Sequence, residues 1–212
     1  ATRLTQQFGV AHLTIHTAET EDPEFARNPP DRCYHCKIEL FEKLGTVAEK
    51  RGIDWVIDAS NLDDCSDYRP GMRAARELGV RSPLVEAKLG KEEIRELSHR
   101  MGLPTWNKPS MACLASRFPY GEEITTEKLE RVDGAESFLR ALGFRQVRVR
   151  CHGEIARIEV SKGRVEEIAR DEVRQKVVDH LTQLGFDYVT VDLEGYRTGS
   201  LNEVLPEDQQ GS

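Results

Sequence analysis

The sequence has no long hydrophobic run and few aromatic residues. Of its 212 residues, 38% are hydrophobic and 7% are aromatic. No apolar segment approaches the roughly 20 residues that a membrane-spanning helix needs. The chain also has fewer positive than negative charges: it contains 30 lysines and arginines and 37 aspartates and glutamates, which gives a net charge of −7. These shortages exclude a membrane-embedded protein and argue against a general nucleic-acid-binding surface, although they leave room for a local basic pocket.

The chain has only five cysteines, which is an odd number. A chain of this length can bury enough apolar surface to fold without disulfide bonds. Proteins of reducing compartments keep their cysteines as free or metal-bound thiols. The sequence therefore predicts a cytoplasmic protein whose thiols are free or bind metal.

Helical and extended patterns alternate along the first half, which predicts an α/β fold with a parallel sheet. The first residues are typical of the end of a helix, so we expect further sequence upstream of Ala1. We assign residues 1–118 to this domain. Its predicted elements are helices over residues 31–51, 70–78 and 91–101, strands over 12–17 and 55–58, and an extended segment over 80–86.

The second half predicts a small α+β domain of α-β-β-α-β order over residues 119–205. A polar tail over residues 206–212 is predicted to be disordered. The predicted elements are a helix over residues 126–142, a hairpin of strands 146–151 and 154–160, a helix over 164–184 and a strand over 188–193.

Two cysteines stand in a Cys-x-x-Cys motif at the start of the first predicted helix. Pro29, Pro30 and Asp31 are typical of a helix start, which places Cys33 and Cys36 on one face of the first turn. A helix N-terminus favours thiolates, and two thiolates suit zinc or an iron–sulfur cluster. A redox dithiol or two unligated thiols would fit the pair as well. The sequence has no second Cys-x-x-Cys, which structural zinc sites commonly use.

A third cysteine, Cys113, lies in a polar segment between Pro109 and Arg117. A thiol in a loop beside an arginine is a candidate ligand or nucleophile, although it could also pack as a small hydrophobic residue. Cys151 alternates with valines, which predicts a core position, and Cys65 lies among aspartates in a predicted loop. Three thiolates would hold a metal or cluster and leave one coordination position open.

Several motifs in order resemble the LarE family of ATP-dependent sulfur transferases, and the resemblance covers nearly the whole chain. The motifs are Asn28-Pro-Pro-Asp-Arg-Cys-Tyr-His-Cys-Lys, Asp67-Tyr-Arg-Pro-Gly, Gly79-Val-Arg-Ser-Pro-Leu, Trp106-Asn-Lys, Ala115-Ser-Arg-Phe-Pro-Tyr-Gly, Val147-Arg-Val-Arg-Cys-His-Gly-Glu and Gly195-Tyr-Arg-Thr-Gly.

The resemblance implies the rest of a PP-loop ATP pyrophosphatase domain, adenine nucleotide alpha hydrolase-like, followed by the small α+β domain. It implies ATP with Mg²⁺ as cofactor and pyridinium-3,5-biscarboxylic acid mononucleotide as the nucleotide substrate. ATP would adenylate a carboxylate of this substrate, and sulfur would displace AMP. It also implies a homo-oligomer, up to a hexamer.

The family contains two sulfur chemistries. Some members sacrifice the sulfur of one cysteine, and others hold a [4Fe-4S] cluster on three cysteines. Here Cys113 stands four residues before Arg117 rather than five, and Ala112 occupies the sacrificial position. Together with Cys33 and Cys36, this spacing favours the cluster type, with Cys113 as both ligand and catalytic residue.

One departure from the family concerns ATP. The Ser-Gly-Gly-x-Asp-Ser phosphate loop, whose amides would cradle the phosphates, is absent from the sequence. A smaller departure is Ala59, where the family usually has glycine. We expect the phosphate loop in upstream sequence; the alternative is a chain that has lost ATP activation.

The resemblance also implies binding residues. The substrate-binding candidates are Ser116, Arg117, Arg148, Arg150, Arg69 and Arg197, because arginine suits phosphate recognition. Glu136, Glu159 and Glu167 match acidic positions of a family metal site. Without the resemblance, the hairpin arginines and glutamates would predict a solvated face with cross-strand pairs.

Two other functions fit parts of the pattern. Some PP-loop enzymes that thiolate tRNA also use three cysteines and a [4Fe-4S] cluster, but the acidic chain without lysine or arginine tracts argues against them. A non-catalytic remnant that binds a cluster or a partner is the third possibility.

Overall fold

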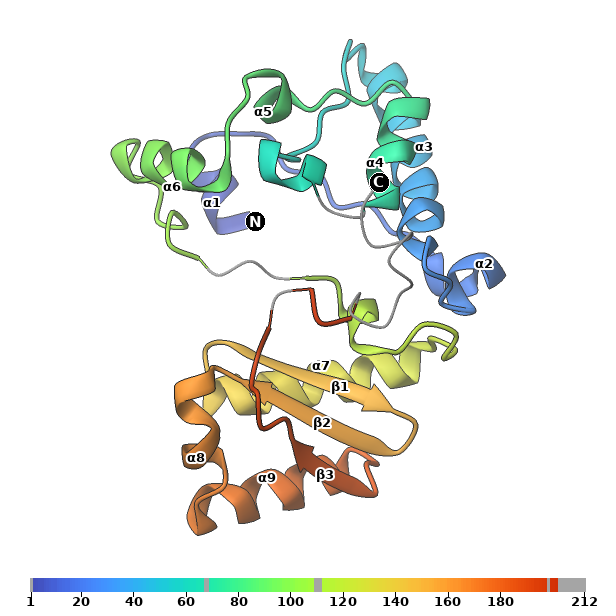
Figure 1. Cartoon of the computed structure of the whole chain (residues 1–212). Helices are drawn as coiled ribbons and strands as arrows, with labels where there is room; N and C mark the ends of the chain where they lie inside the picture. The colour runs from blue at the N-terminus through green and yellow to red at the C-terminus, as the bar shows by residue number, and fades with distance from the viewer. Residues whose placement is uncertain (1, 67–68, 109–111, 198, 202–212) are drawn as a thin grey trace.

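The computed structural model describes residues 2–66, 69–108, 112–197 and 199–201. Figure 1 shows two groups of elements, one before and one after the segment that connects α6 to η3. The first group contains α1 (Thr2–Gln7), η1 (Glu19–Glu21), α2 (Pro23–Ala26), α3 (Arg32–Arg51), η2 (Leu62–Ser66), α4 (Pro70–Glu77), α5 (Pro83–Glu86) and α6 (Lys91–Arg100). The second contains η3 (Leu114–Arg117), α7 (Thr126–Ala141), β1 (Val147–His152), β2 (Ile155–Val160), η4 (Lys162–Arg164), α8 (Val165–Ile168), α9 (Asp171–Gln183) and β3 (Tyr188–Val191).

Helix α3 is the main element of the first group and confirms the helix predicted over residues 31–51. It buries Phe41 in a small core with Ala75 of α4 and with Val80, which follows α4. It ends at Gly52, which adopts the left-handed conformation that glycine accepts without steric cost. The helix therefore presents its first turn, with Cys33 and Cys36, at a fixed place beside α4.

The predicted parallel sheet of the first group is not formed among the described residues. A single parallel bridge joins Ile57 and Arg81, with hydrogen bonds from Asp58 N to Arg81 O (2.9 Å) and from Arg81 N to Val56 O (3.0 Å). The strand predicted over residues 12–17 is wrong, because this segment has no strand partner in the described chain. The extended segment predicted over 80–86 is also partly wrong, since Pro83 begins helix α5.

The second group has the predicted α-β-β-α-β order. Strands β1 and β2 form an antiparallel hairpin in which Arg148 lies opposite Glu159, and Arg150 lies opposite Arg157. Strand β3 pairs with β2 in the parallel direction. Helices α7 and α9 contact each other and the sheet, so Figure 1 shows a sheet backed by two helices. The hairpin arginines therefore lie on the face opposite these helices, because side chains alternate along a strand.

The helix predicted over residues 164–184 is interrupted. Arg170 is extended between α8 and α9 (φ −64°, ψ 142°), and Asp171 and Glu172 then provide the acidic first turn of a new helix.

The predicted core position of Cys151 is confirmed, because this side chain is fully buried. The predicted disordered tail lies outside the described residues. No helix of the described chain combines the length and apolarity needed to cross a bilayer.

The turn after β3 generates a stability prediction at Gly195. This residue has φ +70°, and a Cβ atom there would meet the backbone oxygen of Val160 at 2.7 Å. We expect Gly195→Ala to lower the free energy of unfolding by about 2–3 kcal/mol, measured by urea titration, because a left-handed non-glycine residue and a backbone clash are both unfavourable. Gly163→Ala, which meets nothing within 4 Å, is the control and should change stability by less than about 0.5 kcal/mol. Equal effects of the two variants would contradict the prediction.

Candidate functional site

The two cysteines of the Cys-x-x-Cys motif lie in the first turn of α3. Cys33 is exposed, and Cys36 is partly buried against the core of the second group. Helix α4 approaches this turn closely, since a Cβ atom on Gly71 would lie 3.0 Å from Lys37 Cγ and 3.4 Å from the Cys33 carbonyl oxygen. Glycine at this position therefore lets α4 pack closely against the cysteine-bearing turn, and a side chain there would require Lys37 to shift slightly.

Asn28 joins this helix start to the loop that follows Cys113. Asn28 is fully buried and has φ 55°, a conformation that asparagine tolerates better than most residues. Its Nδ2 donates to the carbonyl oxygen of Pro119 (2.6 Å), and its own carbonyl accepts from Gly121 N (2.9 Å). Arg32 Nη1 donates to Asn28 Oδ1 (2.7 Å). Sequence reasoning missed these roles, although the Asn-Pro-Pro motif marked the place.

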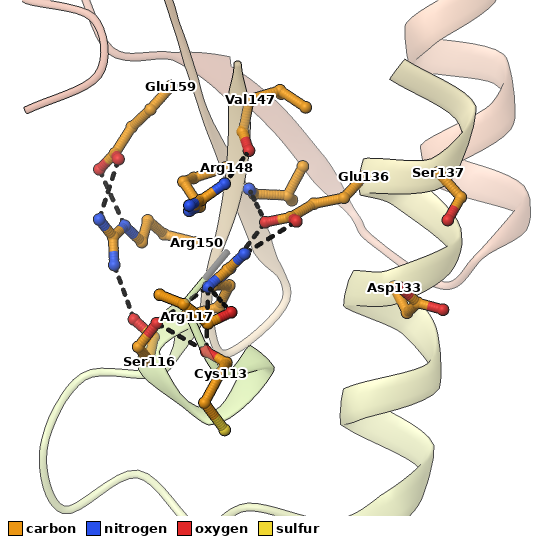
Figure 2. A network of polar contacts seen from close by, with 12 residues as sticks. Cys113, Ser116, Arg117, Asp133, Glu136, Ser137, Val147, Arg148, Arg150 and Glu159 are labelled. Atoms are coloured by element: carbon orange, nitrogen blue, oxygen red, sulfur yellow. Dashed lines mark hydrogen bonds and ion pairs between the residues drawn. The ribbon is translucent and has the colours of Figure 1, made fainter. Parts of the chain in front are cut away.

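Cys113 immediately precedes η3 and is exposed. Its carbonyl oxygen accepts three hydrogen bonds, from Ser116 N (3.0 Å), Ser116 Oγ (2.7 Å) and Arg117 Nη1 (2.9 Å). Figure 2 shows this carbonyl turned toward Arg117 and the sulfur pointing away from the arginines. The loop backbone is thus anchored while the thiol remains available.

Arg117 is buried and pairs with Glu136 of α7. Its Nε and Nη2 donate to the two carboxylate oxygens of Glu136 at 2.7 and 2.9 Å. The same carboxylate accepts from Arg140 Nη1 (3.0 Å) and from Val149 N (3.1 Å) on the outer edge of β1. Burial raises the pKa of Glu136, but the hydrogen bonds and charge of Arg117 outweigh it, so the pKa is lowered. Glu136 is therefore an ionised carboxylate with four donors around it.

A second buried pair lies beside the first. Arg150 donates through Nε and Nη2 to Glu159 at 2.9 and 3.0 Å, and its Nη1 donates to the Ser116 carbonyl oxygen at 2.6 Å. Arg157 also donates to Glu159 (3.1 Å). The cross-strand pairing expected from sequence is confirmed, but the solvated face is wrong, because Arg150 and Glu159 are buried.

The structure does not bring the three predicted metal-binding glutamates together. Glu136 and Glu159 bind different arginines, and Glu167 pairs with Arg164 of the preceding turn. Within the described chain, no three Cys, His, Asp or Glu side chains lie close enough to share one metal ion. The glutamate trio therefore forms no common cation site in this arrangement.

The pKa of each cysteine in α3 depends on the charge of Cys113 as well as on burial. The charge of Cys113 contributes to raising the pKa of both Cys33 and Cys36. Cys33 is partly open to solvent, but the protein around its thiol still desolvates it, and this is the largest cause of the raised pKa; the charge of Arg32 opposes it. Burial also raises the pKa of Cys36 to about 11, with further contributions from Glu19 and the two other thiols. The prediction that the helix start lowers these pKa values is wrong, because the surrounding protein and the neighbouring thiols have the larger effect.

A small cavity of about 140 Å³ lies next to the Cys113 loop. None of the described residues that line it is acidic. Of the predicted substrate-binding residues, it contains Arg117, Arg150 and Arg197. The full lining is Arg117, Pro119, Arg150, His152, Arg157, Arg197, Ser200 and Leu201.

Two lining residues, His152 and Arg157, were not predicted as site residues. Burial lowers the pKa of His152, and the positive charge of Arg157 lowers it further. Arg157 Nε is buried and has no hydrogen-bond partner within the described part of the chain. Both residues line the cavity, where an anion could bind. Their alternation with apolar residues along the hairpin is the feature of the sequence that could have predicted this position.

The other predicted binding residues lie outside the cavity lining. Arg148 is buried, donates to the Val147 carbonyl oxygen (2.9 Å) and lies over the ring of Tyr196. Arg69 forms an ion pair with Asp64 (3.1 Å), and its charge lowers the pKa of Cys33. Arg69 thus belongs to the cysteine side of the site rather than to the cavity.

Three curated proteins are similar to the chain. An uncharacterized protein of Synechocystis is 49% identical over 200 residues, which cover 94% of this chain and 75% of that protein. The pyridinium-3,5-bisthiocarboxylic acid mononucleotide synthase of Lactiplantibacillus plantarum is 40% identical over 190 residues, which cover 89% of this chain and 67% of the synthase. An uncharacterized protein of Methanocaldococcus jannaschii is 35% identical over 172 residues, which cover 81% of this chain and 66% of that protein. The chain matches no family model.

The raised pKa of Cys36 generates a prediction on thiol reactivity. Because the thiolate is the nucleophile, alkylation of Cys36 by iodoacetamide in the metal-free protein should accelerate about tenfold per pH unit above neutrality. The rate should level off only near pH 11, which is the pKa of Cys36. Mass spectrometry of the Cys36 peptide measures the rate, and glutathione in the same reaction controls for the reagent. A plateau for Cys36 below pH 9 would contradict the prediction.

Proposed function

The chain belongs to the LarE family, and we propose that it transfers sulfur to a carboxylate of pyridinium-3,5-biscarboxylic acid mononucleotide. The name of the relative from Lactiplantibacillus describes synthesis of the corresponding bisthiocarboxylic acid mononucleotide. The observation that carries the proposal to this chain is the position of Cys113. The charge of its thiol contributes to the pKa of Cys33 and Cys36, and the loop that carries Cys113 also places Arg117 in the lining of an arginine-rich cavity.

We propose that the sulfur is carried by a [4Fe-4S] cluster held by Cys33, Cys36 and Cys113. The chemistry of the donor set suits such a group, because thiolates are the usual ligands of iron–sulfur clusters and the charge of Cys113 acts on both cysteines of α3. When bound, the cluster would supply an open iron site for a sulfide that serves as sulfur donor.

The residues of the chain would then hold the acceptor. The cavity beside Cys113 offers guanidinium groups, which suit a phosphate monoester. Arg117 and Arg150 line it but are engaged by Glu136, Glu159 and the loop backbone. Arg157 also donates to Glu159 through Nη2, but its Nε has no hydrogen-bond partner among the described residues. We therefore propose that Arg157 and His152 make the direct phosphate contacts, while Arg150 forms part of the cavity wall.

The reaction we propose is an exchange of oxygen for sulfur. ATP and Mg²⁺ convert a substrate carboxylate to an acyl adenylate with release of pyrophosphate, and sulfur attacks the acyl carbon with release of AMP. The sequence contains no Ser-Gly-Gly-x-Asp-Ser motif, so the ATP step rests on family membership alone. The homo-oligomer, up to a hexamer, also stays a prediction.

Metal analysis tests the cluster. After anaerobic reconstitution with iron and sulfide, we expect about four irons per chain and a broad absorbance near about 400 nm. Cys33→Ser, Cys36→Ser and Cys113→Ser should each lose most of this signal, because each removes one of three ligands. Cys65→Ser is the matched control, since Cys65 is an exposed cysteine elsewhere in the first group. A single bound zinc without iron, or equal iron in the Cys113→Ser variant, would refute the cluster.

Calorimetry tests the acceptor cavity. Nicotinic acid mononucleotide carries a pyridinium carboxylate and a phosphate, and it should bind to the protein with a measurable Kd. We expect Arg157→Ala to weaken binding at least about tenfold, because a charge-assisted hydrogen bond contributes about 1.5–3 kcal/mol. Arg174→Ala is the control, since Arg174 is exposed on α9 and pairs with Asp171. An unchanged Kd in Arg157→Ala would remove the proposed phosphate contact.

A further inference from the structure

Every nitrogen of the Arg117 guanidinium already has a partner in the protein. Nε and Nη2 bind the carboxylate of Glu136. Nη1 donates to the carbonyl oxygens of Ala112 (3.2 Å) and Cys113 (2.9 Å) and to Ser116 Oγ (2.9 Å). A substrate contact would require Arg117 to give up one of these bonds, although it was predicted to bind substrate.

The carboxylate of Glu136 is also fully occupied by hydrogen bonds within the protein. Its four hydrogen bonds come from Arg117, Arg140 and the Val149 amide of β1. The Arg117 and Glu136 side chains are 3% and 1% exposed, whereas Arg164 and Glu167, which make a pair of the same kind, are 33% and 37% exposed. The buried pair therefore connects the cysteine loop to both a helix and a strand of the second group.

The loop is held from the other side as well. Asn28, four residues before Arg32 and close to the cysteines of α3, binds the backbone at Pro119 and Gly121. Cys113 thus stands at the start of a segment that is anchored to α7 by Arg117 and to the start of α3 by Asn28. The placement of its thiol relative to Cys33 and Cys36 depends on both anchors.

We propose that Arg117 and Glu136 are a positioning pair that sets where the Cys113 thiol stands relative to Cys33 and Cys36, and that they contact neither substrate nor metal. Arg117 acts on the loop through the Cys113 carbonyl oxygen, and Glu136 acts through Arg117. The importance of this position for catalysis rests on the proposed function, but the position itself can be measured without it.

Cross-linking of the thiols in the metal-free protein tests the pair. Dibromobimane joins two nearby thiols, and mass spectrometry identifies the linked peptides. The wild-type chain should form links from Cys113 to Cys33 or Cys36, together with the Cys33–Cys36 link. Displacement by about 1 Å can cost about 100-fold when two groups must meet in one geometry, so we expect Arg117→Lys and Glu136→Gln to form the Cys113 links at least about tenfold more slowly.

The Cys33–Cys36 link provides the internal control, because both residues lie in one turn of α3. It should be unchanged in both variants if they fold, whereas general unfolding would alter both kinds of link. Ser116→Ala is a milder variant that removes one hydroxyl donor to the Cys113 carbonyl, and it should slow the Cys113 links by a smaller factor. Arg164→Lys, in the exposed pair with Glu167, should leave every link unchanged.

The outcomes separate this inference from the proposed function. An unchanged ratio of Cys113 links to Cys33–Cys36 links in folded Glu136→Gln and Ser116→Ala would overturn the positioning pair, and so would absence of Cys113 links in the wild-type chain. If Arg117→Lys and Glu136→Gln lose the Cys113 links while the wild-type protein never assembles a cluster, the positioning pair is supported and the cluster is refuted. The experiment needs no iron, ATP or substrate.

Discussion

The site depends on one interaction, the buried two-point contact between Arg117 and Glu136. Arg117 follows the cysteine loop and Glu136 lies on α7, while the same carboxylate satisfies the Val149 amide at the open edge of β1. Removing one partner of a buried ion pair typically costs about 3–5 kcal/mol, because the other charge remains buried without compensation. The cysteine loop, α7 and β1 are therefore held together by this contact. The position of Cys113 depends on it, because Arg117 also donates to the Cys113 carbonyl oxygen.

The constraint has an electrostatic consequence at the cysteines. Burial is the largest cause of the raised pKa of Cys33 and Cys36, and repulsion by the negative charge that the Cys113 thiol carries when ionised adds to it. A cationic metal group would relieve this repulsion, so binding must release protons and grow stronger as pH rises. The pKa of Cys36 is raised first by burial and then by Glu19 and the two other thiols, so it does not follow from the first turn of α3 alone.

Local signals in the sequence predicted most helices and the hairpin. Helix α3 ends where Gly52 was expected to end it, and Cys151 lies in the core as its alternation with valines indicated. The strand over residues 12–17 failed because a strand needs a partner, which an alternating pattern does not identify. The pairing of Arg117 with Glu136 was also missed, because tertiary packing brings these residues together across 19 residues of sequence. The pair of Arg150 and Glu159 was easier to predict, because both lie in one hairpin. A charged residue in a motif looks the same whether it faces substrate or a buried carboxylate.

This distinction changes which arginines can recognise an anion. Four guanidinium groups line the cavity, and buried or partly buried carboxylates at Glu136, Glu159 and Asp192 already pair with them. The local excess of positive charge is therefore small, and an acidic chain of net charge −7 adds little long-range attraction. Recognition must depend on donors held in place rather than on a broad positive field. Such a cavity suits a single phosphate of a small nucleotide better than a polyanion, which gains affinity from many separate phosphate contacts.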